Sequence, residues 1–462
     1  MIDSATKADT AAPAPRLPLL VCLGWGAGTL AVASLFNAVN VLLLRYLVDF
    51  VGLGAAFAGS LIALSKLYDA IIDPLVGALS DRSKSRAGRR RPFVLVGGFL
   101  LVLAALMLFN VPFGLSRTAT VVFVVASLMV YATAYATFSV PYMAMPAEMT
   151  RDYHERSYLI SFRVLAVALA SLLAVFAGPV VIGALGGGQP GHTGLSYLLS
   201  VVIVAATLFC FFATRSAPSH YDESTVRIGF FRKLVLIADN KPFMLLLCIK
   251  LMQLLALAVT QAAMPFLFKR VLELSDAMLG LYFLTFYGMM ILMQPLWVRA
   301  GRRFGKRDIY FWATIIYGLL YASWYFVTPD QSLALVFGRG ALLGAAGGAV
   351  LLFGQSLLPD TMEWDYRRTG LRREGMLAGL YTVVEKLAYA LGSGITGIVL
   401  GMSGYIQGAG QAAIAQPPAA IHAIYILASF MPMIFLLLSC IGLRFYTLTE
   451  ASFAETKDPA AT

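Results

Sequence analysis

The chain has 462 residues, of which 59% are hydrophobic and only 13% are charged, and its mean hydropathy is +0.79. Globular domains carry about 25% charged residues, so this composition excludes an ordinary soluble protein. The net charge of +11 does not indicate nucleic-acid binding, because the basic residues lie between apolar runs rather than in one patch. We expect a protein that crosses a membrane many times.

Twelve apolar runs are long enough to cross a bilayer as helices, which takes about 20 residues each. They fall at 18–46, 54–80, 94–113, 119–147, 158–185, 194–214, 242–268, 276–299, 309–328, 332–358, 376–403 and 418–446. We expect an all-α membrane protein with twelve transmembrane helices in two six-helix halves. The expected divisions are a disordered cytoplasmic tail at 1–16, halves at 17–215 and 241–447, a cytoplasmic linker with a short surface helix at 216–240, and a cytoplasmic tail at 448–462.

Basic residues occupy every second connection between the runs. They gather at 82–91, 151–156, 227–241, 299–307 and 367–373. Because loops rich in lysine and arginine stay in the cytoplasm, we expect both termini there. The N-terminal stretch lacks the basic start and the cleavage pattern of a signal peptide.

The few cysteines and histidines do not form a reactive group. All four cysteines fall inside the predicted spans without CxxC spacing, and the four histidines are scattered. We therefore expect no disulfide, no cofactor and no metal beyond a sodium ion. No nucleophile–base arrangement indicates an enzyme.

The second apolar run contains an ionisable cluster. Asp69 and Asp73 are four residues apart and share one helical face, with Lys66 one turn earlier. A charge in the membrane core costs roughly 2.5–3.5 kcal/mol on insertion scales, so such residues are usually functional. One lysine leaves two carboxylates with an excess negative charge, which a proton or sodium ion would neutralise. The alternative is a structural ion pair.

Other polar side chains lie in later runs. Arg163 in the fifth run would line a cavity or gate, or form an ion pair that packs helices. Lys250 and Gln253 share a face of the seventh run and would contact a substrate or bridge helices.

Two weak internal echoes suggest a duplicated unit. Asp73-Pro74-Leu75 is answered by Gln294-Pro295-Leu296, and residues 146–153 are answered by 359–366 with Pro, Met, Asp and Tyr at the same offsets. Repeats of this kind build transporters whose substrate site lies between the halves near the bilayer midplane.

The second run and the turn after it resemble the glycoside–pentoside–hexuronide:cation symporter family of the major facilitator superfamily, to which the melibiose carrier belongs. The matching residues are Asp69-x-x-x-Asp73-Pro74, Gly77, Asp81-Arg82-x-x-x-Arg86-x-Gly88-Arg89-x-Arg91-Pro92 and a second signature that runs from Ser139-Val-Pro141-Tyr142 to Arg163. The resemblance implies a major facilitator fold and import of a sugar or glycoside with a coupling cation, H⁺ or Na⁺.

The resemblance also implies roles for individual residues. Asp69 and Asp73 would form the cation site. Lys386 occupies the position of a family lysine that communicates with the cation and sugar sites, and Thr382, one turn earlier, would add an oxygen. The alternative for Lys386 is a structural salt bridge to an aspartate, and Lys66 would fill the site when the cation is absent.

Charged residues at the cytoplasmic turns would form ion pairs that latch the outward-facing state. These gate residues are Asp81, Arg82, Arg89, Asp152, Glu155, Arg156, Asp365 and Arg372.

The substrate contacts are expected to differ from those of the melibiose carrier. That carrier holds its galactoside with carboxylates in helices I and IV, whereas this chain has no acid at 24–40 and has a serine at the helix IV position. The candidate contacts are Asn37, Asn40, Ser139, Tyr142, Lys250 and Gln253. An anionic uronide or glycoside, a neutral glycoside and an amphipathic lipid all stay open, as does a non-transporting membrane sensor.

Ile72 stands where the melibiose carrier has an asparagine beside its second aspartate. The loss of that oxygen disfavours a sodium site with about six oxygen ligands and favours a proton. The expected partners are thus the small-molecule substrate, the cation and the lipid bilayer, and we expect a monomer.

Overall fold

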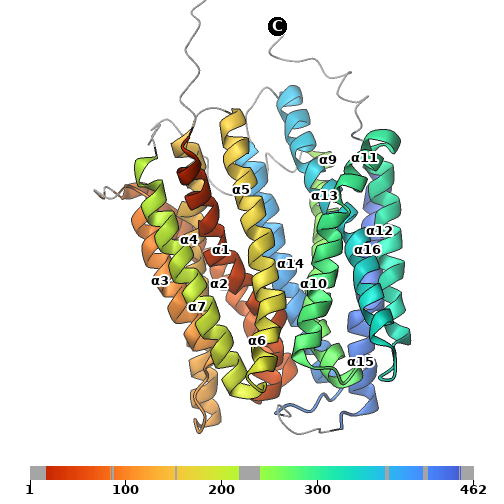
Figure 1. Ribbon diagram of the computed structural model, residues 1–462. Helices are drawn as coiled ribbons and strands as arrows, with labels where there is room; N and C mark the ends of the chain where they lie inside the picture. The colour runs from red at the N-terminus through yellow and green to blue at the C-terminus, as the bar shows by residue number, and fades with distance from the viewer. Residues whose placement is uncertain are drawn as a thin grey trace, which may run out of the picture.

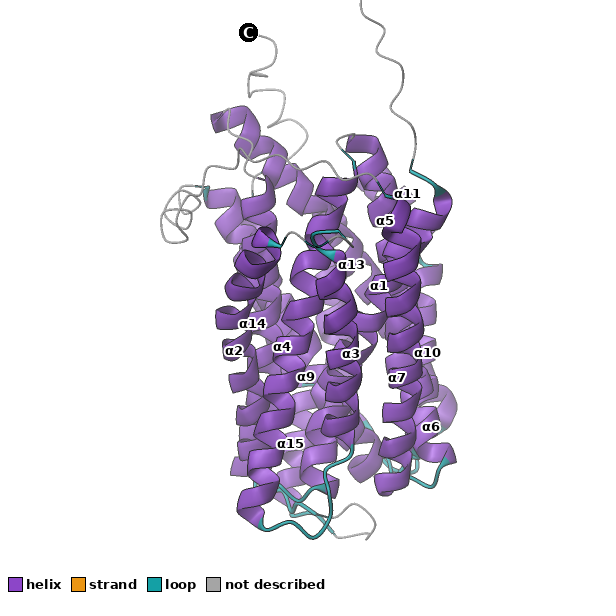
Figure 2. Cartoon of the chain, turned by 90° about the vertical axis from the view of Figure 1, so that its left-hand side faces the viewer, coloured by secondary structure: helices purple, strands orange, loops and turns teal. Residues whose placement is uncertain are grey.

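The computed structural model describes residues 17–83, 85, 88–150, 153–217, 240–369, 374–408, 415–446 and 448. Throughout this part of the chain the regular structure is helical, and the helices run alongside one another in a tall bundle (Figures 1 and 2). The expected tail 1–16, the expected tail 448–462 apart from its first residue, and most of the expected linker, 216–240, lie outside the described residues.

The first half consists of six rods, three of them extended by short π-helical, α-helical or 3-10 segments. They are α1 (Leu19–Ala38) with η1 (Val39–Leu43) and η2 (Tyr46–Phe50), α2 (Ala55–Arg82), α3 (Arg91–Phe109), α4 (Arg117–Met149), α5 (Tyr153–Leu172) with η3 (Leu173–Ala177) and α6 (Gly178–Ala184), and α7 (Gly188–Ala213) with η4 (Thr214–Ser216).

The second half repeats this arrangement with more breaks. Its helices are α9 (Lys241–Phe266) with η5 (Leu267–Val271), α10 (Asp276–Leu292), α11 (Gln294–Phe304), α12 (Lys306–Ala322) with η6 (Ser323–Phe326), α13 (Leu333–Thr369), α14 (Glu374–Met402), α15 (Pro418–Ala428) and α16 (Phe430–Phe445).

The expected all-α membrane class is confirmed. Within the described residues, ten stretches are long and apolar enough to span a membrane, and an eleventh is added if α10 and α11 form one bent span. Their 42° bend falls at Met293, because Pro295 in the first turn of α11 cannot donate a backbone hydrogen bond. The remaining expected span, 309–328, coincides with α12 and η6.

The faces of α2 explain its orientation. Leu64, Leu67, Ile71 and Leu75 recur at helical spacing and are each at least 55% exposed, so they form the stripe that would face lipid. The opposite side of the same helix carries Lys66, Asp69 and Asp73, of which the first two are buried. The sequence thus turns its ionisable face toward the interior of the bundle.

The halves pack closely at one end of the bundle. A Cβ atom added to Gly59 of α2 would lie 2.9 Å from the Cα of Gly397 on α14, and one added to Gly280 of α10 would lie 2.6 Å from the carbonyl oxygen of Phe176. Small residues permit such close helix contacts. In Figure 1, α5 and α10 lie together at this lower end and diverge toward the upper end.

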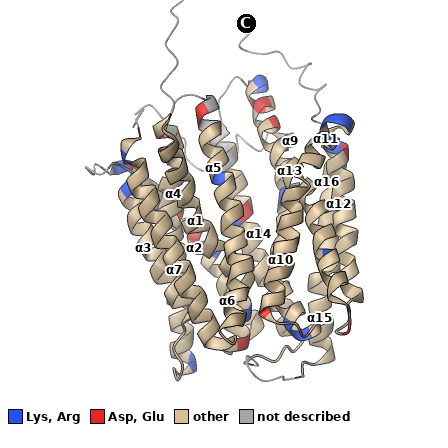
Figure 3. Ribbon diagram, viewed as in Figure 1, with Lys and Arg blue, Asp and Glu red and all other residues tan. Residues whose placement is uncertain are grey.

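We call the upper end of Figure 1, where α2 finishes and α3 begins, the basic end, and the lower end the opposite end. Lys and Arg gather at the basic end, around the starts of α3 and α12, whereas a smaller group of charges lies at the opposite end beside α6 and α10 (Figure 3).

Candidate cation and substrate site

An ion pair between α2 and α14 joins the two halves inside the bundle. Lys386 of α14 contacts Asp73 of α2 through its Nζ and the carboxylate Oδ2. The side chains are 17% and 28% exposed, respectively, so the pair is only partly shielded. Because its members belong to different halves, any ligand that competes for the Asp73 carboxylate also acts on the contact between the halves.

The two aspartates have unused acceptor capacity. Asp69 is 1% exposed, and its Oδ1, like the Oδ1 of Asp73, is buried without a hydrogen-bond partner in the described part of the chain. An unsatisfied buried acceptor costs about 1–3 kcal/mol, and more when it is charged. A proton or a small cation placed between these oxygens would remove that cost.

Lys66 is held by aromatic rings rather than by a carboxylate. Its Nζ lies 5.1 Å from the ring centre of Phe36, 4.9 Å from that of Tyr131 and 6.0 Å from that of Tyr135. Ring faces attract an ammonium within about 6 Å. Among the described residues Lys66 has no ion pair within 4.0 Å, so the aromatic cage keeps it near Asp69 without neutralising that carboxylate directly.

The other two residues predicted for the coupling region differ in exposure. Thr382 is exposed on α14, one turn before Lys386, and Arg163 is half-buried on α5. Their roles as an oxygen donor and a gate or cavity residue stay predictions.

Lys250 is a second buried cation. It lies on α9, is 5% exposed, and places its Nζ 5.7 Å from the ring centre of Tyr381. The Tyr381 hydroxyl is buried and has no hydrogen-bond partner in the described structure. Among the described residues Lys250 has no ion pair within 4.0 Å, but Glu385 of α14 lies close enough to attract its ammonium. An anionic ligand group at Lys250 would therefore compete with Glu385 for this charge.

Gln253 is committed to contacts within its own half. Its Oε1 accepts from the Tyr310 hydroxyl at 2.6 Å, and its Nε2 donates to Ser439 Oγ at 3.4 Å. These bonds use one of the two N–H groups and one of the two lone pairs of the amide, so the predicted substrate contact does not require either bond to be exchanged.

The asparagines of the first helix are partly committed in the same way. Asn37 donates to the Ala33 carbonyl and to Ser171 Oγ, and Asn40 donates to the Phe36 carbonyl. Both are buried, while Ser139 on α4 is half-buried. Each amide oxygen stays available as an acceptor for a ligand hydroxyl.

Tyr142 packs between α4 and α1. Its ring stacks on Trp25 with centroids 5.1 Å apart, and its hydroxyl bonds to Thr29 Oγ1 at 2.8 Å and to the Trp25 carbonyl. A side chain with this many helix-to-helix contacts has a structural explanation that does not need a substrate.

The contacts described for the predicted gate residues in the first half lie within that half. In the first half, Arg89 and Arg90 bind Asp81 at 2.9 and 3.1 Å, and Arg90 binds Glu148 at 2.6 Å. Arg82 is exposed.

The remaining gate positions behave similarly where they are described. Glu155 accepts from the Leu17 amide and from Thr150, and in the second half Asp365 accepts from Asn240 at 3.0 Å. Asp152, Arg372 and the side chain of Arg156 lie outside the described residues.

A second buried charge cluster lies at the opposite end and was missed by the sequence reasoning. It contains Arg45 and Asp49, which follow α1, and Arg270, Asp276 and Tyr405 of the second half. The spacing of Arg45 and Asp49, four residues apart in an apolar context, is the signal that could have found it.

A helical bundle of two halves with buried charges between them defines a polytopic membrane transporter. A family described as MFS/sugar transport protein matches residues 24–450, and the chain therefore belongs to this family. The resemblance of its second helix to the cation symporters is confirmed, as is the expectation that it is a transporter rather than an enzyme.

Individual relatives match along nearly the whole chain. An inner membrane symporter, YicJ, of Escherichia coli (strain K12) is 28% identical over 92% of this chain and 91% of its own. A glucuronide carrier protein homolog of the same organism is 26% identical over 94% and 93%. The structure of a D-xylose–proton symporter superposes with a TM-score of 0.64 at 14% identity, covering 93% of this chain and 96% of that one, which shows the shared fold.

Replacing Tyr142 by Phe distinguishes helix packing from substrate contact. The change removes the hydroxyl but keeps the stacked ring, so we expect a loss of about 1 kcal/mol in unfolding free energy and unchanged substrate affinity. Thermal unfolding with and without substrate measures both quantities. A large loss of affinity at unchanged stability would instead support the predicted substrate role.

Proposed function

We propose that the chain is an inner-membrane symporter that imports a sugar or glycoside with a cation by alternating access between its halves. The observation that carries this proposal concerns Asp69 and Asp73: each has a buried Oδ1 without a hydrogen-bond partner among the described residues, and an ion pair between the halves lies beside them. The basic end would face the cytoplasm, since lysine- and arginine-rich loops are retained there.

Coupling follows from competition for one carboxylate. When a cation or proton occupies Asp69 and Asp73, the attraction that holds Lys386 to Asp73 weakens, and Lys386 becomes free to move with its own half. By linkage, the arrangement of the halves that releases Lys386 must in turn bind the cation more tightly. Cation occupancy and the position of the halves are then linked.

The residues around the aspartates favour a proton as the coupling ion. Sodium would need several oxygen ligands. These residues offer only the two carboxylates and the hydroxyl of the exposed Thr382, and the side chain of Ile72 has no oxygen. A proton needs only one carboxylate, and it binds best where burial makes the charged form unfavourable. Asp69 is buried and fits that requirement.

The buried cation on α9 favours an anionic substrate. Lys250 and the Tyr381 hydroxyl could together hold a carboxylate by charge-assisted hydrogen bonds, and a similar protein is named as a glucuronide carrier homolog. Arg339 does not add to this site, because it donates to Gln331 and lies over the Trp324 ring near the opposite end. We therefore propose a uronide or another acidic glycoside.

Asp73→Asn tests the coupling site. The amide keeps the size of the side chain but cannot take up a coupling proton or balance Lys386. In vesicles we expect cation-driven accumulation to fall to a concentration ratio of about 1 while downhill exchange continues. Asp308→Asn, at an exposed position of the basic end, is the matched control. Continued uphill accumulation by Asp73→Asn would place the site elsewhere.

The choice of ion is tested by separating the two gradients. We expect an imposed inward pH gradient to drive uptake in sodium-free vesicles, and a sodium gradient to have no effect at fixed pH and membrane potential. Sodium-dependent uptake under those clamped conditions would contradict proton coupling.

Lys250→Met tests the substrate class. We expect glucuronides, and not neutral disaccharides, to stabilise the purified protein in thermal-shift measurements. The variant should bind the acidic ligand roughly 10- to 100-fold more weakly, as loss of a charge-assisted hydrogen bond predicts. Lys306→Met at the exposed basic end is the control. Stabilisation by neutral sugars or by an amphipathic lipid alone would refute the acidic substrate.

A further inference from the structure

Five buried side chains join the halves at the opposite end of the bundle. Asp49 of the first half accepts from the Tyr405 hydroxyl at 2.8 Å and pairs with Arg270 Nη2 at 3.3 Å. Arg45, one turn before Asp49, lies 3.6 Å from it and pairs with Asp276 of α10. We call this group the outer cluster.

The outer cluster is charge-balanced and closely bonded. Two arginines face two aspartates, and Arg270 Nε donates to the Tyr405 hydroxyl at 3.0 Å while that hydroxyl donates to Asp49. Burial, and after it the negative charge of Asp49, raises the pKa of the Tyr405 hydroxyl. Tyr405 therefore stays protonated and keeps its bond to the carboxylate.

Main-chain contacts also join the halves around the cluster. The amide of Gly408, beyond α14, donates to the Val48 carbonyl at 2.9 Å across the halves. Nearby, a Cβ atom on Gly183 of α6 would lie 3.5 Å from the Cβ of Ala277 of α10. The opposite end is thus closed by contacts of side chains and main chain together.

Contacts at the basic end are of a different kind. The ion pairs described there join helices of the same half, as between Arg90 and Glu148 or between Lys306 and Asp360. Bonds between the halves at the opposite end, together with the divergence of α5 and α10 toward the basic end (Figure 1), indicate a structure closed toward the side that the outer cluster faces.

We infer that Arg45, Asp49, Arg270, Asp276 and Tyr405 form the extracellular gate, which holds the transporter in its inward-facing state and must break before it opens outward. The inference rests on the proposed transport function for its orientation. It means that the inward-facing state is held by the outer cluster, which is far from the cation site.

The chemistry of the cluster suits a reversible gate. A complete buried ion-pair group gives little net stabilisation over water, because desolvation offsets attraction, whereas losing one partner is strongly destabilising. When the halves separate, all four charges can be hydrated again. A closed state held by this cluster is therefore specific in geometry without being too stable to open.

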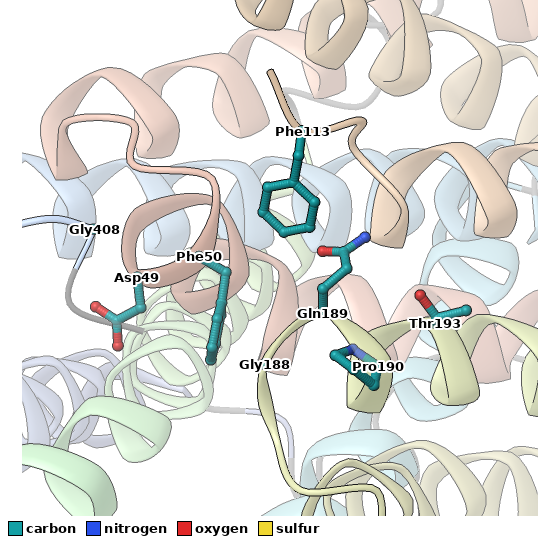
Figure 4. A pocket seen from close by; sticks show the side chains of 8 residues that line it. All are labelled: Asp49, Phe50, Phe113, Gly188, Gln189, Pro190, Thr193 and Gly408. Atoms are coloured by element: carbon teal, nitrogen blue, oxygen red, sulfur yellow. The ribbon is translucent and has the colours of Figure 1, made fainter. Parts of the chain in front are cut away.

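A cavity reaches the cluster from the same end. It measures about 630 Å³ and is lined by Asp49, Phe50, Phe113, Gly408 and the start of α7. Figure 4 shows Asp49 beside the loop that carries Gly408, with Phe113 and Gln189 on the facing side. Water entering this cavity would reach the outer cluster first at Asp49, so we expect opening to begin there.

Cross-linking tests the gate without depending on transport. In a background lacking the four native cysteines, Gly183→Cys with Ala277→Cys places two Cβ atoms within the range of about 3.5–4.5 Å that a disulfide needs. We expect rapid oxidation of the purified protein when the outer cluster is intact. Asp49→Asn should slow it roughly tenfold, because one missing partner destabilises the buried group.

Thiol labelling provides the second measurement. A single Ala277→Cys in the same background should react with a membrane-impermeant reagent roughly tenfold faster when Asp276 is replaced by Asn, since the opened state is then more populated. Tyr405→Phe should give a smaller increase, which separates gating from misfolding. Asp330→Asn, an exposed acid at the same end, should change nothing.

The outcomes are distinct. Unchanged cross-linking and labelling in Asp49→Asn and Asp276→Asn proteins that remain monodisperse would overturn the gate. Absence of sugar transport by the parent protein with an intact outer cluster, with the predicted cross-linking and labelling changes observed, would instead count against the proposed function and leave the gate supported.

Discussion

The constraint on which the structure depends is that ionised side chains inside a membrane must find partners. Asp73 finds Lys386 on the other half, and Arg45 finds Asp276 on the other half. Since part of the neutralisation of these charges comes from the other half, the relative position of the halves is fixed by electrostatics as well as by apolar packing. Apolar packing alone would not do this, because lipid competes equally well for apolar faces.

The two charge groups differ in whether their buried carboxylate oxygens all have partners. The outer cluster is balanced, with two basic and two acidic groups, whereas Asp69 and Asp73 retain unpaired oxygens. A complete group responds mainly to being pulled apart, but an incomplete one also responds to what binds it. The first is suited to holding a state and the second to sensing a ligand.

Much of the architecture could be predicted because hydrophobic runs are long and charges in them are rare. The ionisable face of α2 and its lipid-facing stripe follow from spacing along one helix. What could not be predicted is which helices meet: the aromatic cage of Lys66 draws on Phe36 of α1 and on Tyr131 and Tyr135 of α4. Likewise Tyr142, part of a family signature, is bonded into helix packing, because a motif records residue types and not their neighbours.

The Gly59–Gly397 contact has a mechanical consequence. It lies on α2 and α14, the same helix pair that carries Asp73 and Lys386, so the cation site sits a few turns from the point where the two rods touch most closely. The 28 residues of α2 make a rod about 42 Å long, and Gly59 lies about 35 Å from the end at Arg82, so a tilt of about 10° around the glycine contact moves that end by roughly 6 Å. The same tilt moves Asp73, about 21 Å from the contact, by roughly 3.6 Å, so a small rotation at the glycines displaces the cation site and the basic end together.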